Sequence, residues 1–213
     1  MYQVFKRHIM FMVVAVLAMG GIGISDAIAK DKQSHAVHLG DQAPDFTLPN
    51  AHGQMRSLSE LLKKGPVVLS FYRGGWCPIC NEQLQSYQAD LESFQALGAQ
   101  LVAVSPEKPE SAQDTAVKNM LKFEVLSDEG NDVARLYDLV WSIPEESRAD
   151  FDAWLMSSEG KTLHDFNGLD SYELPIPATF VIRQNGEVAY MFRDQNYKNR
   201  AKNADLMNAL GKK

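Results

Sequence analysis

The chain has 213 residues, a formal net charge of −6, 45% hydrophobic residues and only two cysteines. This length and hydrophobic content fit one domain with a sizeable core, and an acidic chain is a poor candidate for binding nucleic acid. The sequence shows no internal repeat or low-complexity block that would indicate a repeat protein.

Residues 1–29 have the pattern of a removable secretory signal peptide. A basic segment, Lys6-Arg7-His8, precedes an apolar run over residues 9–24, and Ala27-Ile28-Ala29 matches a small-residue cleavage signal. Cleavage would make the mature chain more acidic, because it removes two basic residues and one acidic residue. We therefore predict a periplasmic or secreted protein with no stable membrane insertion after cleavage.

The polar residues 30–38 are expected to be a flexible lead-in to a domain over residues 39–213. The first clear element is a buried strand at residues 67–72, a continuous apolar run behind Gly65-Pro66. A helical pattern begins at Asn81 and ends at Gly98. Its apolar positions recur at spacings of three and four: Leu84, Tyr87, Leu91, Phe94 and Leu97.

Strands and helices alternate farther along the chain, which predicts parallel pairing with helices on both faces of a sheet. The expected elements are strands near residues 101–104 and 124–126, helices near 111–121 and 133–137, and a closing helix near 199–210. Residues 178–182 and 187–191 flank Asn185-Gly186 and predict a hairpin. The fold class is thus a mixed α/β sheet.

The segment over residues 140–173 has a less regular pattern. Phe151, Trp154 and Leu155 have helical spacing and predict a short amphipathic helix. Two interpretations stay open, because this helix could pack over the sheet or form a flap that faces substrate or a second copy of the chain.

The two cysteines, Cys77 and Cys80, lie between the buried strand and the helix that follows it. A disulfide across two intervening residues closes a very small loop and would stabilise the fold little, so a structural staple is disfavoured. A zinc site needs a second ligand pair, and the remaining histidines are scattered, so we predict no metal and no other cofactor.

A cysteine at a helix N-terminus is well suited to redox chemistry. Unpaired backbone N–H groups stabilise the thiolate there and lower the cysteine pKa. We expect Cys77 to be the outer, attacking thiol, Cys80 to be the resolving thiol one turn deeper, and Trp76 to cap the surface of the motif. The two thiols can form a Cys77–Cys80 redox disulfide.

A proline pair, Pro175 and Pro177, precedes the strand at residues 178–182. Proline entering a strand belongs at its start or edge. A rigid loop and a functional cis-proline are both compatible with this spacing.

Four segments together carry a family resemblance. They are G-D-Q-A-P-D-F-T-L at residues 40–48, F-Y-R-G-G-W-C-P-I-C at 71–80, V-L-S-D-E-G at 125–130 and P-A-T-F-V-I-R-Q-N-G at 177–186. They resemble the peroxiredoxins of the alkyl hydroperoxide reductase/thiol-specific antioxidant family, and the C-x-x-C with L-P-I-P-A-T-F-V-I is similar to a peroxiredoxin-like branch. The resemblance implies a thioredoxin-like fold with a peroxiredoxin-type N-terminal extension. It also puts Pro177 at the position of a cis-proline that lies against the C-x-x-C.

The resemblance leaves open which sulfur attacks first. Peroxiredoxins of this family have the pattern P-x-x-x-T-x-x-C, and an ungapped alignment puts Arg73 at the proline, Cys77 at the threonine and Cys80 at the peroxidatic cysteine. The family's later activating arginine falls at Pro177, so the pocket lacks the usual hydroxyl and arginine. We hypothesise that Arg73 supplies a replacement charge.

Two functions follow as alternatives. In the first, the protein is a thiol peroxidase that reduces H2O2 or organic hydroperoxides through a sulfenic acid, and a thioredoxin-like donor reduces it again. In the second, it is an exported thiol-disulfide oxidoreductase that acts on protein disulfides, with Cys77 forming the mixed disulfide. An oligomer is compatible with both.

Overall fold

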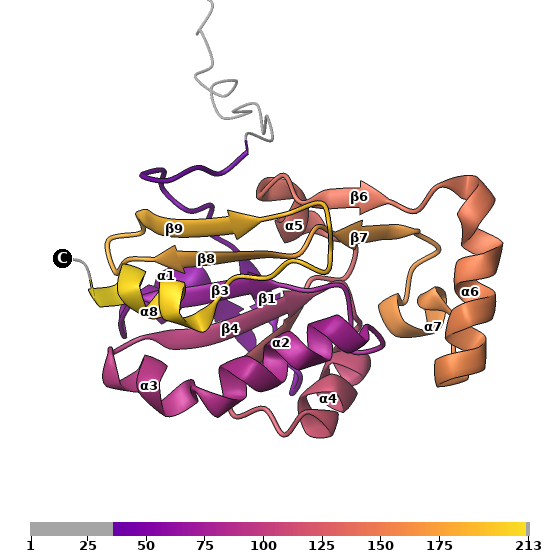
Figure 1. Cartoon of the computed structure of the whole chain (residues 1–213), viewed down its shortest axis with the longest axis horizontal. Coiled ribbons are helices and arrows are strands. Elements are labelled where there is room, and N and C mark those ends of the chain that lie inside the picture. The colour runs from indigo at the N-terminus through magenta and orange to yellow at the C-terminus, as the bar shows by residue number, and fades with distance from the viewer. Residues whose placement is uncertain (1–35, 212–213) are drawn as a thin grey trace, which may run out of the picture. The chain divides into compact units, whose positions relative to one another are not determined.

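A five-stranded mixed sheet forms the centre of the computed structural model, which describes residues 36–211 (Figure 1). Its strand order is β5-β4-β3-β8-β9. The strands are β3 (Val67–Phe71), β4 (Gln100–Ser105), β5 (Glu124–Ser127), β8 (Ala178–Ile182) and β9 (Val188–Arg193). β3, β4 and β5 run parallel, whereas β8 is antiparallel to both β3 and β9. The carboxyl ends of the three parallel strands therefore meet at one edge.

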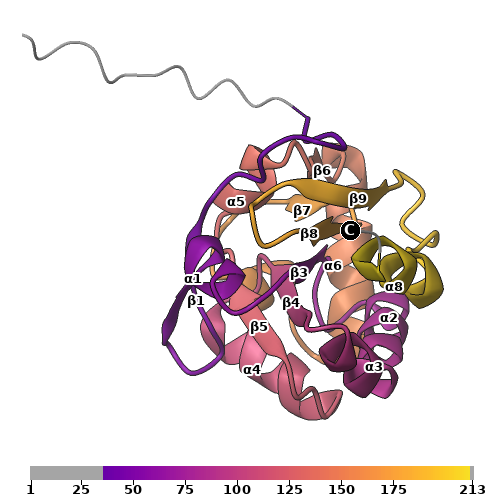
Figure 2. The same cartoon turned by 90° about the vertical axis from the view of Figure 1, so that its left-hand side faces the viewer.

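Helices cover both faces of the sheet, as the alternation of elements predicts (Figure 2). One face packs against α1 (Leu58–Leu62) and α5 (Asp132–Leu136), and the other against α2 (Pro78–Ala89), α3 (Leu91–Ala96), α4 (Pro109–Lys118) and α8 (Asn203–Gly211). Successive β3 side chains point to opposite faces: Val67 and Leu69 join the first core, and Val68 joins the second. All five β3 residues are buried, which explains the continuous apolar run.

The predicted elements of the sheet are confirmed, with small changes in their ends. The helix after the cysteines begins earlier than predicted, at Pro78, because proline fits the first turn where its missing N–H is not needed. This helix also breaks at Asp90 into α2 and α3. The closing helix starts at Asn203 rather than near residue 199.

Two small two-stranded sheets were not predicted. β1 (Thr47–Pro49) pairs with β2 (Met55–Ser57), and β6 (Val140–Ser142) pairs with β7 (Glu173–Pro175), both antiparallel. These strands have three residues each, which is too short for a clear alternation of apolar and polar residues.

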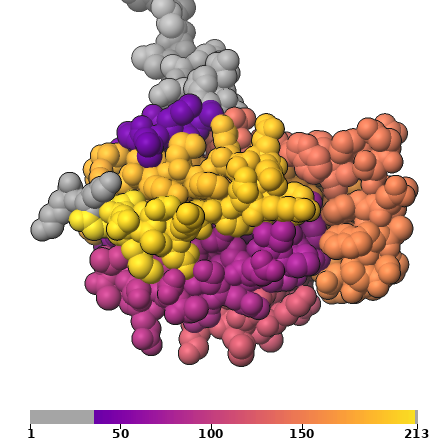
Figure 3. Space-filling view, in the orientation of Figure 1, coloured from indigo at the N-terminus to yellow at the C-terminus, as the bar shows by residue number. Residues whose placement is uncertain are grey.

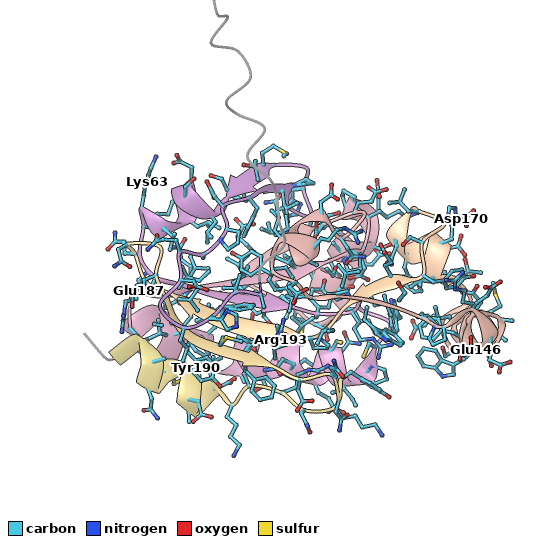
Figure 4. The ribbon with its side chains drawn as sticks, turned by 90° about the horizontal axis from the view of Figure 1, so that it is seen from above. Lys63, Glu146, Asp170, Glu187, Tyr190 and Arg193 are labelled. Atoms are coloured by element: carbon cyan, nitrogen blue, oxygen red, sulfur yellow. The ribbon has the colours of Figure 1, made fainter. Side chains whose placement is uncertain are left out.

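The segment between β6 and β7 forms α6 (Glu145–Glu159) and α7 (Leu163–Asn167). These helices lie beyond the end of the sheet at which α2 begins, and not over its face (Figure 1). Figure 4 shows Glu146 and Asp170 at this end of the domain, opposite Lys63 and Glu187. A capping box between Thr162 and Asp165 starts α7. Leu155 and Leu163 are buried in the same cluster as Ala103 of β4, so both helices pack against the domain, and a role of this segment as a flap stays a prediction.

The described domain starts earlier than the expected boundary at residue 39. Val37 is buried in the core, and the backbone N–H of His38 donates to Asp41 at 2.8 Å. Residues 36–38 are thus in contact with the domain, and the expected flexible lead-in stays a prediction for the residues before them. The predicted signal peptide lies outside the described residues and stays a prediction. Within residues 36–211, no helix is long and apolar enough to cross a membrane.

Candidate active site

Both cysteines lie at the start of α2, as the sequence predicts. Cys77 is the N-cap residue, with φ −87° and ψ 112°, and Cys80 lies in the first turn. The backbone N–H of Cys77 donates to the Gly74 carbonyl at 3.1 Å, and the N–H groups of Cys80 and Asn81 donate to the Cys77 carbonyl. Both side chains are free thiols. The sequence spacing thus becomes a helix N-terminus with one thiol at its cap.

The two glycines of R-G-G-W are required by close packing. Gly74 has φ +147°, and a Cβ atom there would lie 2.3 Å from the Trp76 ring nitrogen. A Cβ atom on Gly75 would lie 1.9 Å from the Thr115 hydroxyl on α4. A larger residue at either position would displace the side chain next to it. The backbone can therefore lie this close to Trp76 and Thr115 only if both positions are glycine.

The Cys77 thiol is the more acidic of the two. A hydrogen bond from the Cys80 side chain is the main cause that lowers its pKa from 9.0 to about 6, and the Cys80 backbone N–H and the charges of Arg73 and Arg200 add to this effect. Burial opposes the shift, because it disfavours the charged form. Cys77 is therefore mostly ionised at pH 7.

Cys80 behaves in the opposite way. Burial is the main cause that raises its pKa well above 9.0, and the hydrogen bond to Cys77 adds to the increase. The Arg200 guanidinium donates to Cys80 Sγ at 3.5 Å and opposes the increase. Arg200 precedes α8, and Figure 3 shows the C-terminal segment (yellow) lying directly against α2 (magenta). The two opposite shifts favour a thiolate on Cys77 and a proton on Cys80.

Both cysteines are buried, Cys77 to 3% exposure and Cys80 to 1%. Cys77 lines the cavity described below and Cys80 does not, so Cys77 is the outer thiol of the pair, as expected, although neither side chain lies on the surface. Burial follows from the tertiary contacts of the C-terminal segment and α6, neither of which is close to the motif in sequence.

Arg73 lies between two aromatic rings beside the thiols. Its Cζ atom is 5.1 Å from the centre of the Trp76 ring and 4.5 Å from the centre of the Tyr197 ring. A cavity of about 550 Å³ is lined by Arg73, Cys77 and Tyr197, together with Trp76, Phe151 and Trp154. A cation held between aromatic faces is stabilised by the ring electrons. Arg73 therefore places a positive charge in the cavity that contains the acidic thiol.

Trp76 does not cap the surface of the motif, which corrects the prediction. It is 2% exposed, and α6 covers it through edge-to-face contacts with Phe151 and Trp154 at ring-centre distances of 5.4 and 6.1 Å. Trp154 is instead exposed. A large apolar ring is buried wherever a partner helix is available, and α6 supplies that helix.

Of the two interpretations of the proline pair, the cis-proline that the resemblance implies is not found, and the rigid loop remains. The described residues contain no cis peptide bond. Ile176 and Pro177 connect β7 to β8, and the Ile176 N–H donates to the Leu139 carbonyl at 2.5 Å. Pro177 lines a second cavity of about 390 Å³, which shares Arg73 and Tyr197 with the first. Cys77 is not among the residues that line it.

Three residues of the site were not predicted from the sequence: Tyr197, Arg200 and the buried Glu107. Tyr197 and Arg200 follow the last strand and have no motif, and Glu107 follows β4 in a loop. The only available signal for Glu107 was its place after a strand whose carboxyl end lies at the reactive edge. Among the described residues, no group of three or more His, Cys, Asp or Glu side chains is arranged to hold a metal ion.

A sequence model of the AhpC/TSA family matches residues 39–191, which is well over half of the chain. The chain belongs to the AhpC/TSA family. The match covers the strand, the C-x-x-C and the hairpin that carry the resemblance. Arg200 lies beyond it.

Curated relatives of this AhpC/TSA protein include peroxiredoxins and thiol-disulfide oxidoreductases. It is 31% identical over 159 residues to a chloroplastic peroxiredoxin Q of rice (Oryza sativa subsp. japonica), which covers 75% of this chain and 60% of the relative. It is 23% identical over 170 residues to the thiol-disulfide oxidoreductase ResA of Bacillus cereus, covering 79% and 92%. The match spans only 49% and 60% of the first two relatives, from Populus jackii and rice.

Solved structures agree with the fold. A peroxidoxin, BcpB from Mycobacterium tuberculosis, superposes with a TM-score of 0.61 at 23% identity and covers 81% of this chain and 97% of that one. A peroxiredoxin-like protein from Aquifex aeolicus superposes with a TM-score of 0.63 at 15% identity, covering 83% and 87%. The predicted thioredoxin-like fold of the peroxiredoxin type is confirmed.

Proposed function

We propose that this protein is a thiol peroxidase that reduces H2O2 or organic hydroperoxides through Cys77 and Cys80. The Cys77 thiolate attacks one peroxide oxygen, the O–O bond breaks, and the other oxygen leaves as water or an alcohol after taking a proton. The resulting Cys77 sulfenic acid condenses with the Cys80 thiol, which releases water and forms the Cys77–Cys80 disulfide. An external dithiol then reduces the disulfide and is itself oxidised.

The observation that carries this proposal is an acidic thiol that is almost completely buried beside two guanidinium groups. Cys77 is 3% exposed, and the charges of Arg73 and Arg200 both lower its pKa. A small peroxide can reach such a buried sulfur more readily than a disulfide bond of another protein can. Positive charge beside the sulfur would also stabilise the negative charge that develops on the leaving oxygen.

We further propose that Cys77 attacks first, although the family alignment puts Cys80 at the peroxidatic position. The thiolate is the nucleophile, and the structure favours ionisation of Cys77 and protonation of Cys80. A protonated Cys80 hydrogen-bonded to Cys77 is well placed to resolve a sulfenic acid.

Protein thiol-disulfide exchange is the second candidate. It is favoured by the N-cap position of Cys77 and by the similarity to ResA over most of both chains. In this reading the bound protein would have to move Tyr197 or α6, because they line the cavity above Cys77. The two candidates thus differ in the size of substrate that the covered thiol accepts.

Rapid mixing of the reduced protein with H2O2 or cumene hydroperoxide tests the proposal. We expect the native protein to consume peroxide faster than a free thiol of equal acidity at the same pH. Cys80→Ser should consume one equivalent and stop at a trappable sulfenic acid, while Cys77→Ser should not react. Activity that survives only in Cys77→Ser would assign the attack to Cys80. A native rate equal to that of a free thiol, with rapid insulin reduction, would favour the second candidate.

We also propose that the protein is exported and that its electron donor is a thioredoxin-like protein. The signal-like pattern of residues 1–29 supports export, and the family supports a dithiol donor. Sequencing the N-terminus of the protein recovered from a periplasmic fraction tests export, and a retained residue 1 would contradict it.

A further inference from the structure

Glu107 is a completely buried acidic residue at the reactive edge of the sheet. It follows β4 by two residues and is 0% exposed. The Ser127 hydroxyl at the end of β5 donates to the Glu107 backbone carbonyl at 2.6 Å, and Tyr72 follows directly after β3. Glu107 therefore lies where the carboxyl ends of the three parallel strands meet.

Four groups donate hydrogen bonds to its carboxylate. Oε1 accepts from the Gly75 backbone N–H at 2.9 Å and from the Thr115 hydroxyl at 3.0 Å. Oε2 accepts from the Tyr72 hydroxyl and from the Ser105 hydroxyl, each at 3.0 Å. A carboxyl group that only accepts hydrogen bonds is satisfied in its ionised form. Burial raises the pKa of Glu107, and these hydrogen bonds oppose the increase.

A buried carboxylate without a cation is costly, which calls for a reason. The ion pairs found among the described residues do not include Glu107. An apolar residue could fill the same space, but it could not accept the hydrogen of the Gly75 amide. We infer that the carboxylate is present because of the groups that its two oxygens bind.

The two oxygens hold the active-site loop on both sides of Arg73. Oε2 binds Tyr72, the residue before Arg73, and Oε1 binds Gly75, two residues after it. The carbonyl of Gly75 is held as well, because it accepts a hydrogen bond from the Asn81 side chain at 2.7 Å. The loop that carries Arg73 and leads into Cys77 is thus attached to a rigid point.

We propose that Glu107 is a positioning residue for the dithiol: through Tyr72 and Gly75 it fixes the loop that places Arg73 beside Cys77 and starts α2 at that cysteine. This rests on the proposed redox function of Cys77 and Cys80. Glu107 acts on the thiols through the loop and contacts neither sulfur.

The test compares Glu107→Gln with the native protein by titrating the Cys77 thiolate through its absorbance at 240 nm. Glutamine keeps the shape of the side chain, but one oxygen becomes a donor that faces hydrogens of the loop or α4. If Glu107 positions the loop, its release weakens the contacts that stabilise the thiolate. We expect the acidity of Cys77 to fall by on the order of tenfold. Removing a negative charge would by itself change the acidity in the opposite direction, so the sign separates the two effects.

Asp128→Asn is a matched control. Asp128 is also buried at the carboxyl end of a parallel strand, and it accepts from the backbone N–H groups of Val133 and Ala134 at 2.9 and 2.8 Å. These bonds hold the start of α5 and not the active-site loop. The control should lose thermal stability without any change in the titration of Cys77.

A Glu107→Gln protein that folds but titrates as the native protein does, or is more acidic at Cys77, would overturn the proposal. If that variant does not fold, Tyr72→Phe removes only the bond from the loop to Oε2. Tyr72→Phe should then give a smaller loss of acidity in the same direction, and an unchanged titration would likewise refute the proposal. No peroxide is used, so failure here is distinguishable from failure of the peroxidase proposal.

Discussion

Replacing Cys80 by alanine should make Cys77 a much weaker acid. The fall of the Cys77 pKa from 9.0 to about 6 corresponds to about 4 kcal/mol of stabilisation of the thiolate relative to the thiol. The largest cause is the hydrogen bond from the Cys80 side chain. A hydrogen bond to a charged group contributes about 1.5–3 kcal/mol, so its loss should reduce the acidity of Cys77 roughly ten- to a hundredfold.

The consequence at pH 7 is large enough to measure. The ionised fraction of Cys77 should fall from about nine-tenths to between about one-half and one-tenth. The rate of alkylation by iodoacetamide reports this fraction, because only the thiolate reacts. The rate is measured from about pH 4 to about pH 10, a range that includes both pKa values. In the native protein the rate should rise as the pH increases through about 6.

Cys80→Ser is the matched control, because its hydroxyl can still donate a hydrogen bond to the Cys77 sulfur. It should keep most of the acidity that Cys80→Ala loses. If alanine at this position leaves the inflection near pH 6, the hydrogen bond is not the main cause. The helix N-terminus and the two arginines would then have to account for the acidity.

Three further variants test separate parts of the site. Gly75→Ala should lower the free energy of unfolding by about 1–3 kcal/mol in chemical denaturation, because its Cβ would lie 1.9 Å from the Thr115 hydroxyl. Adding Thr115→Ala should recover part of this loss, and losses that simply add would contradict the clash. Arg200→Met should also reduce the acidity of Cys77, but less than Cys80→Ala does, because its charge is a smaller cause; an equal or larger effect in the same titration would refute this order. Tyr197→Ala should speed the reaction of Cys77 with a bulky hydroperoxide several-fold more than the reaction with H2O2, because Tyr197 lines the cavity above the thiol. Equal acceleration of the two reactions in rapid mixing would show that the Tyr197 ring does not limit access of peroxide to Cys77.

The position of the dithiol could be predicted because it depends on neighbours in sequence. The apolar run over Val67–Phe71 indicates a buried strand, and the spacing after Cys80 indicates a helix. A cysteine between the two must lie near the first helical turn, whatever the rest of the chain does. The same local signals predicted the hairpin of β8 and β9.

The surroundings of the dithiol could not be predicted in this way. Arg200 lies 120 positions after Cys80, and its contact with the sulfur exists only because the segment before α8 packs against α2. The burial of Trp76 depends on α6, which begins at Glu145. Charge and burial at a sulfur are sums over spatial neighbours, and spacing along the chain does not contain them.

The sequence by itself determined the fold class, the pair of sulfurs and their place at a helix N-terminus, because strand and helix signals are local and periodic. The tertiary structure decided which sulfur ionises. It buries Cys80, directs its hydrogen bond to Cys77 and brings Arg73 and Arg200 to the same site. It also decided why Gly75 must be glycine, since the Thr115 hydroxyl of α4 lies where a Cβ atom would be. Such contacts depend on close packing in three dimensions, where a few tenths of an ångström change the energy of each group.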